Sequence, residues 1–175
     1  MGLKTTKLTL FALLIFYSSC NNNKEEERYV IEQNFEKEKI EVNREIVRRE
    51  NEDIELIAKR YNWNLTRTET GLYYMILNQT KGKFPQKKDI VNIKGIIMLP
   101  NGKEIYNSET EGIKQFTVDM SEEPVGLHEL VKLMRVGEKS NAIIPSYIAY
   151  GISGNGVNIP AVSSLICKLE LISIN

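Results

Sequence analysis

The residue types that most often carry metal or nucleophilic chemistry are scarce in this sequence. It contains one histidine, His128, and two cysteines, Cys20 and Cys167. One His with two Cys cannot complete a structural zinc site of four protein ligands, and two cysteines so differently placed do not form a disulfide framework. We therefore expect no metal, no cofactor and no disulfide bond. We place His128 on the polar side of a helix, without a catalytic role.

The stretch from Gly137 to Ile174 carries the most specific pattern. Two Ile-Pro pairs, Ile144-Pro145 and Ile159-Pro160, enclose a glycine-rich loop that contains Ala149-Tyr150-Gly151. A Gly-Glu pair precedes this stretch of landmarks, and the run from Leu165 to Leu171 follows it as a closing strand. Five landmarks in a fixed order are far more specific than a single Ala-Tyr-Gly.

This order resembles the C-terminal half of FKBP-type peptidyl-prolyl cis-trans isomerases. The resemblance extends from Gly71 to Ile174 and includes an Asn-Gly hairpin at Asn101-Gly102 and a helix that ends at Leu133-Met134. The chain as a whole looks like the FKBP-type isomerase lipoproteins associated with gliding motility. The resemblance implies a rotamase that acts on proline-containing polypeptides.

The apolar pattern predicts an α+β fold. From about Thr66 the chain forms short β-like runs separated by turns, and Leu127, Leu130, Val131 and Met134 recur at helical spacing. We expect an FKBP-like antiparallel sheet wrapped on one short helix and preceded by a long charged N-terminal helix.

Prolyl isomerisation needs neither a nucleophile nor a proton transfer. The enzyme must twist a tertiary amide whose rotation barrier is about 18–20 kcal/mol. The twisted amide has a less polar carbonyl, so a dry apolar pocket favours it over the planar ground state. The absence of acid–base motifs therefore does not argue against an enzyme.

The resemblance implies a site of seven side chains. Tyr150 stands where the family has its hydroxyl donor, and Phe116 stands at an aromatic wall. The other five positions are Ile93, Ile105, Tyr106, Leu127 and Cys167. For Tyr150, Leu127 and Cys167, simple packing in the core is the alternative.

Several of these positions depart from the family pattern. Ile93 replaces a strand Tyr, Ile105-Tyr106 replaces Phe-Asp, Leu127 replaces a Trp floor and Cys167 replaces a wall Phe. Pro124 falls near the position whose backbone N–H should bind a substrate carbonyl, and proline has none. Either Val125 supplies that donor or the contact is missing.

The N-terminus has the pattern of a secretory signal. Lys4 and Lys7 precede an apolar run from Leu8 to Tyr17, and Ser18-Ser19-Cys20 follow it. About ten apolar residues span about 15 Å as a helix, roughly half the hydrocarbon core. We expect a lipoprotein signal peptide at 1–19 with acylated Cys20, whereas the alternative is an ordinary cleaved signal.

A dense charged segment follows Cys20. NNNKEEE is similar to the export signal of some surface lipoproteins, or it is a flexible tether. From Glu25 to Tyr61 there is no Gly or Pro, which favours a long helix that ends near Asn62-Trp63-Asn64. Its narrow apolar stripe leaves three roles open: a spacer, a helix packed on the domain, or a dimer arm.

The expected organisation is therefore a signal at 1–19, a charged tether and long helix at 20–64, and one isomerase domain at 65–175. Acidic and basic residues balance at 23 each, so charge gives no reason to expect nucleic acid as a partner. We expect a location in the cell envelope, anchored by lipid at Cys20 to the outer membrane, with the domain in the periplasm or at the surface.

Two functions follow from the sequence. The first is a peptidyl-prolyl isomerase that assists the folding of exported envelope proteins, including those of a gliding-motility machinery. The second is an FKBP-like interaction module with weak or lost catalysis, favoured by the substitutions at Ile93, Leu127, Cys167 and Pro124.

Overall fold

The computed structural model describes residues 22–175 of the chain, with side chains from residue 28 onward. The expected signal peptide and Cys20 lie outside the described residues. The chain divides into two compact units, Met1–Arg48 and Arg49–Asn175. One long helix, α2 (Asn22–Tyr61), contributes residues to both units.

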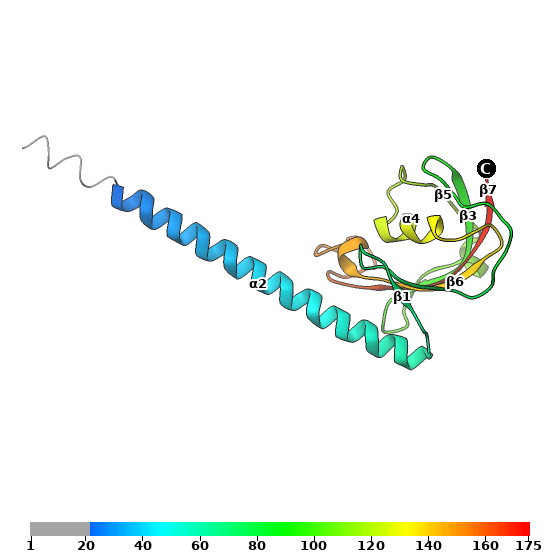
Figure 1. The fold of residues 1–175 in the computed structure, drawn as a ribbon, viewed down its shortest axis with the longest axis horizontal. Helices are drawn as coiled ribbons and strands as arrows, with labels where there is room; N and C mark the ends of the chain where they lie inside the picture. Colours follow the sequence, from blue (N-terminus) through cyan, green and yellow to red (C-terminus); the bar gives the residue numbers. More distant parts are fainter. Residues whose placement is uncertain (1–21) are drawn as a thin grey trace, which may run out of the picture. The chain divides into compact units, whose positions relative to one another are not determined.

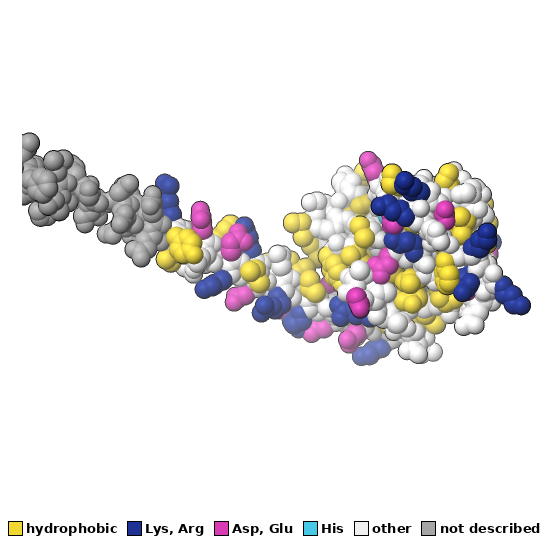
Figure 2. Space-filling model, turned by 45° about the horizontal axis from the view of Figure 1, so that its top comes forward, with side chains coloured by type: hydrophobic (Ala, Val, Ile, Leu, Met, Phe, Trp, Pro, Cys, Tyr) yellow, Lys and Arg dark blue, Asp and Glu magenta, His cyan; other side chains and the backbone are white. Residues whose placement is uncertain are grey.

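Within the first unit, the described residues belong to α2. Short ion pairs lie along its surface, such as Lys39 Nζ to Glu36 Oε1 at 2.7 Å. Phe35 and Ile40 are exposed between these charged groups, and Figure 2 shows hydrophobic, basic and acidic side chains interspersed along the helix. Within residues 22–175, no helix combines the length and hydrophobicity that crossing a bilayer requires.

In the second unit, the last turns of α2 pack against the sheet. Ile54 and Ile57 are buried with Ile143 and Ile166 of two central strands. The helix ends at Tyr61, and Asn62 adopts a positive φ of 54°, as the sequence predicted for this boundary. The compact unit thus begins at Arg49, upstream of residue 65, because these helical residues share a core with the sheet.

The described part of the second unit contains one sheet of seven strands, with the order β1-β2-β6-β7-β3-β4 and β5 paired to β3. The strands are β1 (Thr66–Arg67), β2 (Tyr73–Ile76), β3 (Ile90–Met98), β4 (Glu104–Asn107), β5 (Lys114–Thr117), β6 (Lys139–Ile144) and β7 (Leu165–Ile174). All pairings are antiparallel. Helix α4 (Val125–Lys132) lies against the curved sheet in Figure 1. The predicted α+β fold class is confirmed.

Strand β3 pairs with two different strands along one edge. Its first half pairs with β5 and its second half pairs with β4, and the short helix α3 (Ser108–Glu111) connects those two strands. At the change of partner, Gly95 has a φ of +135°, and a side-chain carbon there would lie 2.0 Å from the Lys168 carbonyl oxygen. The Gly95 N–H instead donates to Ser108 Oγ at 2.9 Å. Glycine at this position lets one strand serve both neighbours.

The main core lies between α4 and the sheet. Leu127, Leu130, Val131 and Met134 are all nearly inaccessible, as their helical spacing predicted. Packing alternates along β7 from Leu165 to Leu171, so the odd-numbered residues of this stretch face this core while Ile166 faces α2. The sheet is therefore covered on both faces near the start of β7.

The predicted placement of His128 on the polar side of its helix was wrong. This side chain is buried, and its Nδ1 accepts a hydrogen bond from the Asp119 N–H at 3.1 Å. Because a backbone N–H can only donate, Nδ1 carries no proton, so Nε2–H donates to the Ser121 carbonyl at 3.2 Å. His128 stabilises the turn that leads into α4.

Removing apolar volume between α2 and the sheet should destabilise the second unit. Ile54 is 1% exposed, so Ile54→Ala should lower the free energy of unfolding by about 2–5 kcal/mol through the cavity it leaves. The fluorescence of Trp63, the only tryptophan, reports on this cluster during denaturant titration.

Leu56→Ala is the matched control for that experiment. Leu56 lies on the same helix but is 59% exposed, so its loss should change stability by less than about 0.5 kcal/mol. Equal effects of the two substitutions would show that the end of α2 is not docked.

Candidate active site

A small pocket of about 100 Å³ opens beside the start of α4. Strands, a helix start and the long connection between β6 and β7 all contribute to it. Its lining residues are Ile97, Ile105, Tyr106, Glu111, Lys114, Glu123, Pro124, Leu127, Ile144, Tyr150, Ile159 and Leu165. Six of these twelve residues are aliphatic, and the three charged ones come from the segments beside β4 and before α4.

The structure brings four of the seven predicted site residues to this pocket. Tyr150, Ile105, Tyr106 and Leu127 line it. The other three, Phe116, Ile93 and Cys167, are buried in the same core cluster and do not border the pocket. Phe116 packs its ring edge to face with His128, at 5.3 Å between ring centroids.

Tyr150 is the hydroxyl best placed to bind a ligand. It lies in the connection that follows the 3₁₀ helix η1 (Ser146–Ile148) and is partly buried. Burial raises the pKa of Tyr150 above its ordinary value, and the nearby charge of Glu123 adds to this effect. Among the residues that the structure describes, none hydrogen-bonds the Tyr150 hydroxyl. It is therefore a neutral O–H donor with its proton available.

Tyr106 has a different role. Its hydroxyl donates to the Gly112 carbonyl at 2.7 Å, and the Ile93 carbonyl lies 3.5 Å away. Burial raises the pKa of Tyr106, and the Lys114 ammonium lies 5.5 Å from the ring centroid. The single hydroxyl proton is already used within the protein, so Tyr106 contributes a fixed aromatic wall.

An ion pair stands at the edge of the pocket. Lys114 Nζ and a Glu123 carboxylate oxygen are 2.8 Å apart, and both residues, together with Glu111, line the pocket. No sequence pattern pointed to this pair, because β5 and the segment before α4 meet only in the folded chain. Ile144 and Ile159 did carry a signal, since each begins one of the two Ile-Pro pairs.

The start of α4 supplies backbone donors near the pocket. Pro124 precedes the helix, and its carbonyl accepts from the Leu127 N–H at 2.9 Å and the His128 N–H at 3.2 Å. Val125 is the first helical residue and is exposed. First-turn N–H groups have no acceptor within their own helix. Val125 can therefore offer the donor that Pro124 lacks.

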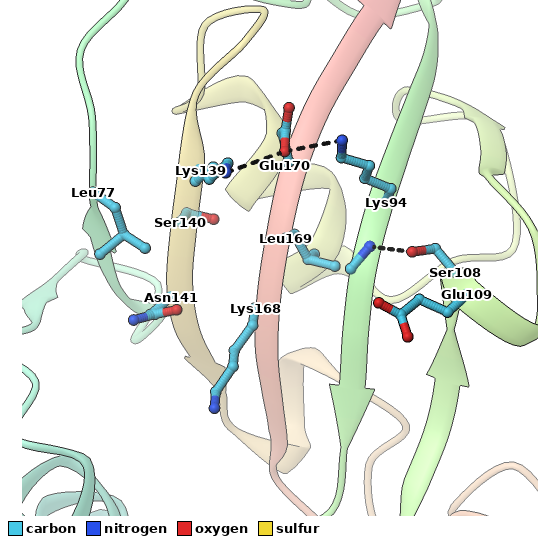
Figure 3. Close-up of a pocket in the computed structure, with 11 residues that line it drawn as sticks. Leu77, Lys94, Ser108, Glu109, Lys139, Ser140, Asn141, Lys168, Leu169 and Glu170 are labelled. Atoms are coloured by element: carbon cyan, nitrogen blue, oxygen red, sulfur yellow. Dashed lines mark hydrogen bonds and ion pairs between the residues drawn. The ribbon is translucent and has the colours of Figure 1, made fainter.

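A second, more open pocket lies among β3, β6 and β7, and Figure 3 shows its lining. Glu170 there bridges Lys94 at 3.3 Å and Lys139 at 3.7 Å. Five lysine and glutamate residues line this pocket, and it is open to solvent, so it cannot exclude water from an amide. The smaller pocket is more enclosed and fits prolyl chemistry better.

The model of one protein family, FKBP-type peptidyl-prolyl cis-trans isomerase, matches residues 81–172, which is more than half of the chain. The chain belongs to this family. The FKBP-type match begins downstream of α2 and includes β3 to β7, α4 and the pocket.

Curated proteins similar to this chain are also FKBP-type isomerases. The 22 kDa FKBP-type isomerase of Escherichia coli is 34% identical over 112 residues, covering 61% of this chain and 52% of that protein. FkpA of Aeromonas hydrophila is 35% identical over 107 residues, which cover 61% of this chain and 39% of that protein. The chain thus spans about half or less of the length of these relatives.

Solved structures share the fold. The crystal structure of FkpA from Escherichia coli has a TM-score of 0.65 at 24% identity and covers 100% of this chain and 84% of that one. The crystal structure of AtFKBP13 has a TM-score of 0.60 at 23% identity, and the match covers 64% of this chain and 99% of that one. At these identities the likeness concerns the fold.

Cys167 occupies a wall position of the FKBP-type pattern but behaves as a small core residue. It is fully inaccessible, and burial raises the pKa of its thiol to about 12. Only the thiolate reacts readily with electrophiles. The thiol is therefore both neutral and shielded near neutral pH.

Cys167 in the folded protein should resist alkylation by iodoacetamide at pH 8. In denaturant the same thiol should react within minutes, because it regains its ordinary pKa and access to solvent. Peptide mapping by mass spectrometry after both treatments measures the modified fraction at Cys167. Equal modification in the two samples would place this residue at the surface.

Proposed function

We propose that this protein is a peptidyl-prolyl cis-trans isomerase that acts on proline-containing polypeptides. The observation that carries the proposal is the small pocket that is lined by six aliphatic residues and bordered by the neutral hydroxyl of Tyr150, in a chain of the FKBP-type family. The arrangement contains what amide rotation needs: apolar walls and a hydrogen-bond donor beside them.

The proline ring of a substrate would enter between the aliphatic walls. Leu127 contributes to these walls from α4, Ile144 from the end of β6, and Ile159 from the connection that also carries Tyr150. These side chains replace water around the amide, which favours the twisted state with its less polar carbonyl. The Tyr150 O–H and the Val125 N–H are the donors available for carbonyls of the substrate.

The walls predict modest rather than tight binding. Leu127 is smaller than the Trp that the family pattern has at this position, so it offers less contact area to the proline ring. The Lys114–Glu123 pair at the edge must also remain hydrated or paired while a peptide enters. We expect the tight drug-like ligands of the family to bind poorly.

Catalysis of cis-to-trans conversion in a short proline peptide tests the proposal. The soluble protein from Glu25 onward should accelerate the conversion. Tyr150→Phe should weaken peptide binding by about 1 kcal/mol, which is roughly fivefold, because one hydrogen bond is lost.

Tyr147→Phe is the control for this measurement. Tyr147 lies three residues away in the same connection but does not line the pocket. It should retain the wild-type affinity. If the two phenylalanine variants were equally active and bound peptide equally well, Tyr150 would have no role in the site.

A second function has its own support. The pocket is small, its edge carries an ion pair, and Pro124 offers no N–H at the helix start. These features suit an FKBP-like module that binds a partner without catalysis. A folded protein that binds proline peptides and leaves their isomerisation rate unchanged would establish this alternative.

We further propose that the protein is anchored in the cell envelope by acylation of Cys20. The support is the order of Lys4 and Lys7, an apolar run and Ser18-Ser19-Cys20. The resemblance to lipoproteins associated with gliding motility suggests clients among the proteins of that machinery.

Substitution of the proposed acylation site tests the anchor. Cys20→Ser should abolish labelling by a radioactive or clickable fatty acid and move the protein from the membrane fraction to the soluble fraction. A Cys20→Ser protein that still sediments entirely with membranes would refute the lipid anchor.

A further inference from the structure

Glu50 is a buried acid in the last turns of α2, outside the family-matched residues and outside the pocket. Its side chain is 7% exposed. Oε1 accepts from the Ser146 N–H at 2.6 Å and from Ser164 Oγ at 2.7 Å, and Oε2 accepts from Ser146 Oγ at 2.9 Å. One carboxylate thus receives three hydrogen bonds from two residues that are far from it in sequence.

Those two residues are the ends of a single connection. β6 ends at Ile144 and β7 begins at Leu165, so Ser146 and Ser164 stand at opposite ends of the segment that contains Tyr150. A buried carboxylate loses several kcal/mol of hydration free energy unless hydrogen-bond donors replace the water. The donors here come from both ends of the connection, so Glu50 fixes the two ends together.

The network continues from Ser146 to Tyr150. The Ser146 carbonyl accepts from the Ala149 N–H at 3.0 Å and from the Gly151 N–H at 2.7 Å, the two residues on either side of Tyr150. The Gly151 carbonyl in turn accepts from the Val162 N–H at 3.0 Å. Holding Ser146 in place therefore holds the backbone from which the Tyr150 ring extends.

We propose that Glu50 is a positioning residue for Tyr150, so that the end of α2 is a working part of the isomerase site. The inference rests on the proposed function, in which Tyr150 binds the substrate. Glu50 itself touches no substrate and acts through Ser146, Ser164 and the connection between β6 and β7.

The test compares Glu50→Ala with Glu50→Gln in the full chain. Alanine removes both carboxylate oxygens and with them all three hydrogen bonds. Glutamine keeps an oxygen at the Oε1 position for the Ser146 N–H and Ser164 Oγ, and its amide group can donate to Ser146 Oγ, which can accept. Asp53→Ala, an exposed acid one turn further along α2, is the matched control.

Glu50→Ala should lower kcat/KM at least tenfold. It should also speed amide hydrogen exchange of residues 146–164 at least tenfold, while the amides of β3 and β7 keep their protection from exchange. Glu50→Gln and Asp53→Ala should stay within about threefold of wild type in both measurements. Uniform loss of protection over the whole unit, or an unchanged kcat/KM, would overturn the inference.

A double variant separates positioning from general destabilisation. If Glu50 acts through Tyr150, then Tyr150→Phe should weaken peptide binding less than twofold when Glu50 is already alanine. In the otherwise wild-type protein the same substitution should weaken peptide binding roughly fivefold. Full additivity would contradict the inference. If Glu50→Ala does not fold, Ser164→Ala removes only one donor and should loosen the same segment to a smaller extent.

The result also distinguishes the two proposals. A wild-type chain that does not accelerate isomerisation overturns the proposed function. In that case, amide hydrogen exchange in Glu50→Ala alone decides whether Glu50 positions the connection. Faster exchange confined to residues 146–164 supports the inference, and unchanged exchange or a uniform increase over the whole unit overturns it.

Discussion

The central constraint on this domain is the complete burial of the first residues of β7. β6 and β3 pair along its two edges, and both of its faces are covered near its start. Leu165 and Cys167 pack toward α4, whereas Ile166 packs toward α2. Further along, Lys168 and Glu170 replace the apolar residues on the second face, and the Lys168 ammonium lies 4.7 Å from the ring centroid of Tyr61 at the end of α2. The side-chain alternation of one strand thus determines where a second layer can form.

The pocket is a continuation of the main core rather than a separate cavity. Ile97 and Leu165, which line it, belong to the same cluster as the buried Cys167. Tyr106 is fixed by hydrogen bonding and Tyr150 is not, so the two tyrosines divide the roles of wall and donor. Small changes in core packing are therefore expected to alter the shape of the pocket as well as the stability of the domain.

Local patterns predicted the elements well. The spacing of Leu127, Leu130, Val131 and Met134 gave α4, and Asn62 marked the end of α2, because these signals depend on neighbours in the chain. The family resemblance gave the fold and four pocket residues. His128 was misplaced because its partners, Asp119 and Ser121, belong to a turn whose shape the apolar pattern does not report.

Long-range contacts could not be predicted in the same way. Glu50 looks like any surface acid of a charged helix, and its partners lie 96 and 114 positions away. The ion pair of Lys114 with Glu123 has the same character, since only the folded sheet brings the residues together. Sequence spacing is informative where the local backbone conformation sets the distance between two residues. In these pairs the tertiary fold sets that distance, so spacing does not reveal them.

The position of Trp63 has a spectroscopic consequence. It stacks on Tyr61 at 4.8 Å between ring centroids, with the Lys168 ammonium 5.8 Å from its ring, in the cluster on the α2 face of the sheet. The pocket opens from the other core and has Leu127 as its floor. Emission from Trp63 should therefore be insensitive to pocket occupancy, whereas any fluorescence response to a bound peptide should come from Tyr106 and Tyr150, which line the pocket.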